Sequence, residues 1–208
     1  MKKILTHRLM LPIAALVLLI VINTIARPSF ISVTVKGEQL YGPLIDILRN
    51  SAPLMLVSLG MMVVIATRGI DLSVGAIMAV TGAVALTIID GSETPHEIGT
   101  VLGAIAVAVF IGLLLGVWNG FLVAVIGVQP IIATLVLMLA GRGVALLITG
   151  GFITTINSAP YKFMAQGYVL WLPFAFFVSL AAVVLVALIE RRTALGVLTE
   201  AVGINPEA

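Results

Sequence analysis

The sequence predicts an all-α protein, a polytopic transmembrane helix bundle. Of its 208 residues, 61% are apolar and only 10% are charged, whereas about a quarter of the residues in a soluble domain are charged. The mean hydropathy of +1.25 agrees with this class. Charge-free windows cover residues 9–26, 50–67, 72–89, 98–141, 143–161 and 163–189. Each window is about as long as a helix that crosses a bilayer.

Six spanning helices are expected from these windows, near residues 9–26, 52–67, 72–89, 99–117, 130–149 and 169–189. In hydrocarbon every backbone N–H and C=O group must be paired within its own segment or in a closed barrel, so long apolar runs without alternation form helices. The first run also resembles a secretory signal peptide, but it exceeds the usual apolar length of about 7 to 15 residues. Further spans follow it, which favours a retained helix.

The segments between the spans give the orientation. Lys and Arg are more frequent on the side of the N-terminus (residues 2, 3, 8, 68, 191 and 192) than on the other side (27, 36, 49 and 162). This bias predicts a cytoplasmic N-terminus and a cytoplasmic segment at 191–208. Residues 44–49 of the long outer loop have the pattern of a short amphipathic surface helix. Residues 117–128 are interpreted as a helix end followed by a re-entrant half-helix.

Small residues recur every four positions in the fourth span, at Ala104, Ala108, Gly112, Gly116, Gly120 and Ala124. Gly75, Ala79 and Ala83 repeat the pattern in the third span. Such stripes let two helices approach closely. We therefore predict helix packing at Gly75, Gly112, Gly116 and Gly120, and we favour packing over a pore-lining role.

Polar residues at membrane depth are costly, and five of them are candidates for the translocation path. They are Asp71, Ser73, Asn119, Gln129 and Arg142. Asp71 and Ser73 either cap the third helix or contribute to the path. Arg142 either pairs with a carboxylate such as Asp90 or extends its side chain to the membrane surface, and the remaining alternative is substrate contact. Asn119 and Gln129 either bind a polyhydroxy ligand or join helices.

Several classes of function are excluded. The chain has no Cys, which removes disulfides and thiol chemistry. The motifs HExxH, GxSxG and GxxxxGK[ST] are absent, so no catalytic residue, metal site or bound cofactor is expected. A net charge of +2 gives no reason to expect a nucleic-acid partner. The spans lack the buried carboxylates and histidines of a proton-coupled pump, so energy for transport should come from a partner protein.

Four ordered motifs resemble one family, the permease subunits of bacterial ribose-type ABC sugar importers. Residues 69–75 read GIDLSVG, residues 118–123 read WNGFLV, residues 130–135 read PIIATL before GRG at 141–143, and TALG at 193–196 precedes AVGIN at 201–205. Residues 42–48, 118–120 and 193–205 are most similar to permeases of galactofuranose importers. The resemblance therefore implies a monosaccharide cargo, galactofuranose or else ribose or another pentose or hexose.

The resemblance also implies partners and a location. A second permease subunit would complete the path in the bacterial inner membrane, a periplasmic binding protein would deliver the sugar, and cytoplasmic ABC ATPase subunits would bind the ATP. The ATPases would dock on the coupling segment that starts at 191, through Thr193, Leu195, Gly196, Ala201, Gly203 and Asn205. Family members continue for several helices beyond this segment, so we expect a truncated permease. The alternative is a short membrane scaffold or assembly subunit that does not transport.

Overall fold

The computed structural model describes residues 10–37 and 39–205. Helix α2 (Met10–Ala26) leads through a 3-10 turn η1 (Pro28–Ile31) to a hairpin of β1 (Thr34–Lys36) and β2 (Gln39–Tyr41). The long helices are α3 (Pro43–Ala66), α4 (Val74–Asp90), α5 (Ile98–Ala124), α6 (Pro130–Ile148) and α8 (Phe174–Arg192). Shorter elements are α7 (Ala159–Gln166), the hairpin of β3 (Tyr168–Val169) and β4 (Leu172–Pro173), and α9 (Ala194–Ile204).

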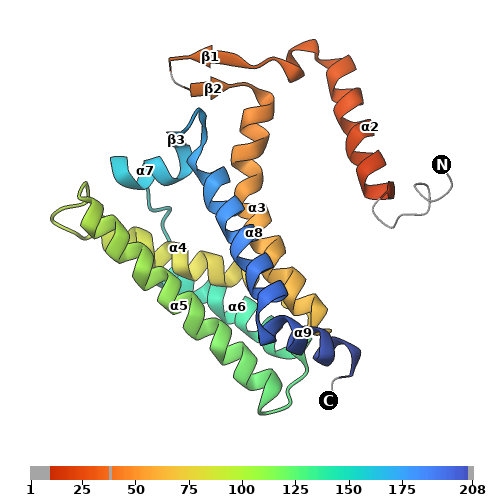
Figure 1. Cartoon of the computed structure of the whole chain (residues 1–208). Coiled ribbons are helices and arrows are strands. Elements are labelled where there is room, and N and C mark those ends of the chain that lie inside the picture. The colour runs from red at the N-terminus through yellow and green to blue at the C-terminus, as the bar shows by residue number, and fades with distance from the viewer. Residues whose placement is uncertain (1–9, 38, 206–208) are drawn as a thin grey trace.

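Helix α2 stands apart in Figure 1 and packs mainly on η1, whereas the other helices form two groups that meet at an angle. In one group α4 packs against α5 and α6, and in the other α3 packs against α8. Helix α9 packs against the ends of α8 and α3, whereas α7 contacts both α8 and α5. We call the end of the bundle near α9, at which α3, α5 and α8 finish, the α9 end (Figure 1). The opposite end, where both hairpins lie, is the hairpin end.

Small side chains hold the α4–α5–α6 group together. Val80 and Ala83 of α4 pack with Ala145 of α6, and a second cluster joins Ile89 of α4 to Val101 and Ala104 of α5. The closest approach is at Gly141, where an added Cβ atom would lie 3.0 Å from the Cβ atom of Ala76. Without a strong hydrophobic drive between helices in lipid, close backbone packing of this kind supplies the association energy.

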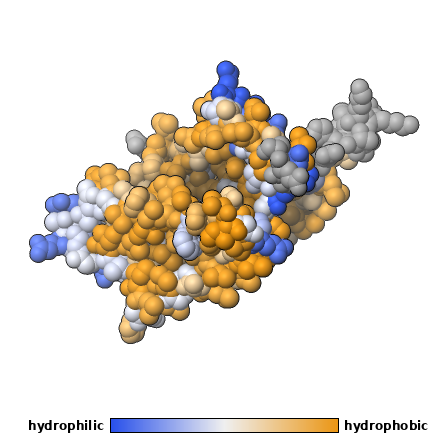
Figure 2. Space-filling view, turned by 90° about the horizontal axis from the view of Figure 1, so that it is seen from below, coloured by the Kyte–Doolittle hydropathy of each residue, from blue (hydrophilic) through white to orange (hydrophobic). Residues whose placement is uncertain are grey.

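The surface of the bundle is apolar. Many large apolar side chains of the long helices are exposed, and Figure 2 shows apolar residues over most of one face, with hydrophilic residues toward its edges. Four helices, α3, α5, α6 and α8, are long and apolar enough to cross a membrane, while α2 and α4 have 17 residues each. About 17 residues still reach the lower limit for a span. The expected helical membrane bundle is confirmed.

Three boundaries differ from the sequence prediction. The helix of 44–49 is not a separate surface element, because it is the start of α3, which continues for 24 residues from Pro43 to Ala66 with Pro53 in its interior. Pro43 begins α3 at the first helical position, where a missing N–H leaves no intrahelical bond unmade. The prediction of a re-entrant half-helix at 117–128 is also wrong, because α5 is one continuous helix of 27 residues from Ile98 to Ala124.

The last span begins at Phe174 instead of near residue 169. Leu170 and Trp171 have φ angles of 48° and 73°, which form the tight turn between β3 and β4. Pro173 then occupies the position before the first helical residue. Apolar composition alone did not distinguish this hairpin from the start of the helix.

Candidate functional site

The turn before α4 brings two predicted path residues together. Ser73 donates to the Asp71 carboxylate twice, from its backbone N–H at 2.7 Å and from its hydroxyl at 2.6 Å between the oxygens. The Ser73 carbonyl accepts the first bond of α4 from Ile77 N–H. Asp71 therefore fixes the turn that leads into α4, by an Asx-type bond to the residue two positions on. It does not cap the helix itself, because Ser73 is the N-cap residue and no side chain forms a capping hydrogen bond there.

A side chain from α5 extends this network. The Asn119 amide donates to the Ser73 hydroxyl at 2.9 Å, and the two residues lie 46 positions apart. Asn119 is only 6% exposed, and its Oδ1 atom has no hydrogen-bond partner among the described residues. The relay from Asn119 through Ser73 to Asp71 joins α5 to the start of α4 at the α9 end of the bundle. A polar residue inside α5 is tolerated because this pairing satisfies its donor.

Thr134 adds a contact from α6 that sequence reasoning did not select. Its hydroxyl donates to the Pro130 carbonyl at 2.8 Å, and its oxygen lies 3.5 Å from the Ile70 carbonyl. Thr134 is buried. Its place in the PIIATL motif was visible, but only the fold shows that it packs on the loop before Asp71. The loop of residues 69–73 is thus held between α5 and α6.

The other two predicted path residues lie elsewhere. Gln129 directly precedes α6 and is exposed. Arg142 is exposed on α6, and it forms no ion pair with Asp90; within the described ranges the ion pair present is Arg49 with Asp46, at 2.7 Å. The structure therefore does not form the Arg142–Asp90 pair, and both residues are exposed. The structure brings together Asp71, Ser73 and Asn119 only.

The packing glycines differ in their surroundings. A Cβ atom at Gly112 would lie 3.4 Å from the Thr81 methyl group and 3.8 Å from an Ile77 methyl group of α4. At Gly75, Gly116 and Gly120 an added Cβ atom would meet nothing within 4 Å. Gly112 thus lies at a helix contact, whereas a packing role for the other three stays a prediction.

The predicted coupling segment forms helix α9, and both ends of this helix contact neighbouring helices. Thr193 caps α9 by accepting from Leu195 N–H at 3.2 Å and donates its hydroxyl to the Ile189 carbonyl at 2.7 Å. A Cβ atom at Gly196 would collide with the Glu190 carbonyl of α8, and one at Gly203 with the Ala66 carbonyl of α3. Only glycine permits such approaches, which explains these two residues of the motif physically.

Arg68 ties the far end of α9 to the end of α3. Its guanidinium Nη2 donates to the Ile204 carbonyl at 3.2 Å. Arg68 has a φ angle of 59°, a left-handed conformation that usually favours glycine, and so it carries backbone strain. The Ala201 carbonyl accepts from Asn205 N–H at 2.9 Å and closes the last turn of α9. Helix α9 is therefore attached to the ends of both α3 and α8.

The exposed face of α9 is apolar. Leu195, Val197, Leu198 and Ile204 are each more than half exposed, with Ile204 at 78%. This face lies beside the charged end of α8, which contains Glu190, Arg191 and Arg192. Exposed apolar side chains rimmed by charges are typical of a protein interface. Within the described residues no group of His, Cys, Asp or Glu is arranged to hold a metal ion.

Residues 44–208 match the family model described as the branched-chain amino acid transport system permease component. The chain is 44% identical to the galactofuranose transporter permease protein YtfT of Escherichia coli over 94% of its own length and 56% of the relative. It is 42% identical to the fructose import permease protein FruF of Bifidobacterium longum, over 100% of this chain and 58% of the relative.

The ribose import permease protein RbsC of Haemophilus influenzae is 33% identical, over 93% of this chain and 57% of the relative. The chain thus spans little more than half the length of the relatives it matches. No solved structure matches it.

Proposed function

The chain belongs to the family of branched-chain amino acid transport system permease components, and on that premise we propose that it forms part of the membrane path of an ABC-type sugar importer. The family relatives are permeases named for galactofuranose, fructose and ribose. The chain is a multi-pass protein of the inner membrane. A monosaccharide is the proposed cargo, and a sugar-binding protein, a second permease subunit and ATPase subunits are the proposed partners.

Helix α9 carries the coupling part of this proposal. In the orientation predicted from Lys and Arg, the α9 end lies in the cytoplasm. The apolar face of α9 offers a docking surface for an ATPase subunit that supplies ATP, while Gly196, Gly203 and Arg68 transmit movement of α9 to α3 and α8. A rigid attachment is what a lever between two proteins requires, because a flexible connector would absorb the displacement.

The relay of Asp71, Ser73 and Asn119 has a supporting role in the same proposal. It fixes the loop between the α3–α8 pair and the α4–α5–α6 group, close to α9. Movement of α3 relative to α4 must bend this loop. We assign the three residues to the inner end of the path, where they hold the two groups in register rather than contact the cargo in the state described.

Copurification and uptake test this function. The tagged complete permease is purified from its native membrane in mild detergent, and its companions are identified by mass spectrometry. Uptake of D-ribose, D-fructose and D-galactose into vesicles is measured with ATP, with L-leucine as the probe for amino-acid transport. An ATPase companion together with sugar uptake supports the proposal, whereas uptake of leucine alone, or of no probe, contradicts it.

A matched pair of variants tests the docking surface. Leu198→Glu places a charge on the exposed face of α9 and should abolish recovery of the ATPase with the permease. Ile153→Glu places the same charge on a 96% exposed residue at the hairpin end and should leave recovery unchanged. Both variants should insert normally, because neither side chain is buried in the bundle. Equal recovery from the two variants would refute the role of α9.

A further inference from the structure

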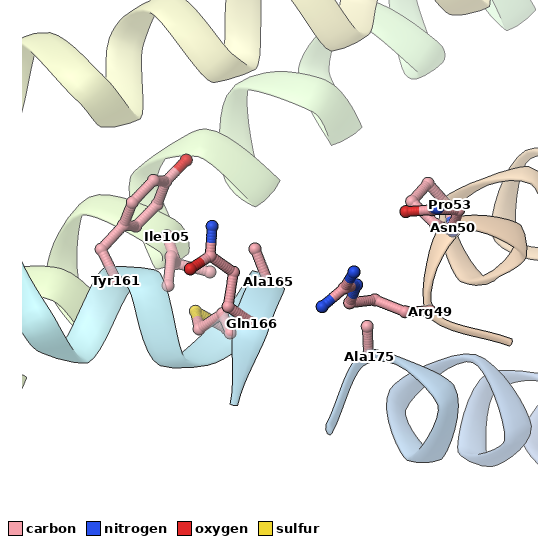
Figure 3. A pocket seen from close by; sticks show the side chains of 9 residues that line it. Arg49, Asn50, Pro53, Ile105, Tyr161, Ala165, Gln166 and Ala175 are labelled. Carbon is pink, nitrogen blue, oxygen red and sulfur yellow. The ribbon is translucent and has the colours of Figure 1, made fainter. Parts of the chain in front are cut away.

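A cavity of about 720 Å³, lined by both polar and apolar residues, lies between the two helix groups near the hairpin end. Its walls come from α3, α5, α7 and α8. Figure 3 shows the Arg49 side chain and Asn50 extending from α3 toward Gln166 of α7. The volume lies within the range of about 300 to 1,000 Å³ typical of small-molecule sites.

The polar side chains of this cavity have free hydrogen-bonding capacity. In the described part of the chain, the amides of Asn50 and Gln166 and the hydroxyl of Tyr161 form no side-chain hydrogen bond. Arg49 uses one guanidinium nitrogen for the carboxylate of Asp46, at 2.7 Å. A guanidinium has five N–H donors in all, so donors remain for a ligand.

The combination of these groups defines the chemistry of the ligand. Two amides and one phenol both donate and accept hydrogen bonds, as the hydroxyl groups of a sugar do. The rest of the lining is apolar, with Pro53 and Ile105 among it, which suits the C–H faces of a sugar ring. Asp46 balances the charge of Arg49, so the cavity does not specifically favour an anion.

A second cavity of the bundle has no polar side chains in its lining. A cavity of about 550 Å³ along α8 is lined only by apolar side chains, from Phe177 to Ile189. Such a groove suits lipid tails or another apolar helix. The lining of the Arg49 cavity differs because it receives Arg49, Asn50 and Gln166 from two different helices that converge on one space.

We propose that the cavity between α3, α5, α7 and α8 binds a neutral sugar, held by hydrogen bonds from Arg49, Asn50 and Gln166. This inference rests on the proposed function. Arg49 lies six residues after Pro43, about 9 Å along α3 at 1.5 Å per residue. The cavity is therefore near the end of the bundle opposite α9, where cargo arrives if α9 meets the ATPase. One wall belongs to the α3–α8 pair that α9 is attached to.

Transport kinetics of the assembled importer provide the first test. The complete permease and its partners are reconstituted in proteoliposomes, and uptake of D-ribose, D-fructose and D-galactose is measured. Asn50→Ala and Gln166→Ala should each raise KM roughly threefold to tenfold, the effect of losing one hydrogen bond to a ligand. Asn157→Ala is the matched control, because this exposed amide near the same end pairs with Lys162 outside the cavity. Its KM should stay within about twofold.

Cysteine protection provides a test that does not depend on transport rates. Residues 1–208 contain no Cys, so the peptide that carries Gln166→Cys has one thiol, and its labelling by a maleimide is read on that peptide. The transported sugar should slow this labelling at least threefold. The same sugar should not slow labelling of Glu93→Cys, on the exposed loop between α4 and α5.

The possible results distinguish a failure of the sugar-binding cavity from a failure of the sugar-permease function. Normal sugar uptake with unchanged KM in both alanine variants would overturn the cavity assignment and leave the importer function intact. A Cys at 166 that does not react with or without sugar would mean that protein fills the cavity, which also overturns it. A wild-type importer that takes up none of the probes would refute the sugar-permease function, and the assignment would fall with it.

Discussion

The contact between α4 and α5 at Gly112 gives the sharpest test of the packing. Gly112 and Gly116 lie one helical turn apart in the same small-residue stripe, so the sequence alone predicts equal effects of enlarging either residue. The structure predicts different effects. Gly112→Leu should destabilise the fold, whereas Gly116→Leu should not.

The expected magnitude follows from the distances. A Cβ atom at Gly112 would lie 3.4 Å from a Thr81 carbon, which is ordinary van der Waals contact, so Gly112→Ala should be neutral or stabilising. A leucine carries three more carbons toward α4, and overpacking of this kind costs about 1 to 3 kcal/mol. Gly116 faces open space, so Gly116→Leu should change the free energy of unfolding by at most about 0.5 kcal/mol from packing. The loss of glycine also favours the helix by several tenths of a kcal/mol at either position.

The assay is reversible unfolding of the detergent-solubilised chain by a denaturing surfactant, followed by tryptophan fluorescence. The free energies of unfolding of the wild type, Gly112→Ala, Gly112→Leu and Gly116→Leu are compared in the same mixed micelles. Gly112→Leu should be the least stable by about 1 kcal/mol or more. If Gly116→Leu were destabilised as much as Gly112→Leu, the placement of the α4–α5 contact would be refuted.

Other perturbations address the remaining contacts. Gly203→Val should separate α9 from the Ala66 carbonyl and lower ATPase recovery while insertion into membranes, measured by protease protection, is unchanged. Asn119→Leu loses one hydrogen bond but also removes the unpaired Oδ1 atom, so its free energy of unfolding should stay within about 1 kcal/mol of the wild type. Ser73→Val removes both side-chain bonds of the relay and should cost more than Asn119→Leu in the same titration; the reverse order would contradict the relay. Gly141→Leu should destabilise the fold by about 1 to 3 kcal/mol, because Ala76 leaves no room for the side chain, and an unchanged unfolding midpoint would argue against the α4–α6 contact.

The class of fold was predictable because hydrocarbon permits few backbone structures. Long apolar runs had to be helices, and α6 begins at the Pro130 that the sequence marked. The predicted helix boundaries were wrong where polar residues or glycines lie inside a continuous helix. Asn119 and Gly120 suggested that α5 ends early, yet the pairing of Asn119 with Ser73 keeps a polar residue inside a continuous helix.

The site was predictable as a set of residue types but not as an arrangement. Asp71, Ser73 and Asn119 were selected because polar groups at membrane depth are costly, and the structure joins them in one relay. Arg142 was selected for the same reason and joins nothing in that relay. Sequence periodicity gives the face of a helix but not which neighbour covers it. The sequence therefore revealed neither that Arg142 and Asp90 form no ion pair nor that Gly116 has open surroundings.

The sequence by itself determined that this protein is a bundle of membrane helices from a permease family, since composition, span length and four ordered motifs suffice for that. Only the tertiary structure decided which residues meet. It attached α9 to α3 and α8 through Gly196, Gly203 and Arg68, and it placed Arg49, Asn50 and Gln166 around one cavity. The physical reason is that spanning depends on the local transfer of each segment from water to lipid, whereas a binding cavity depends on how distant helices cross.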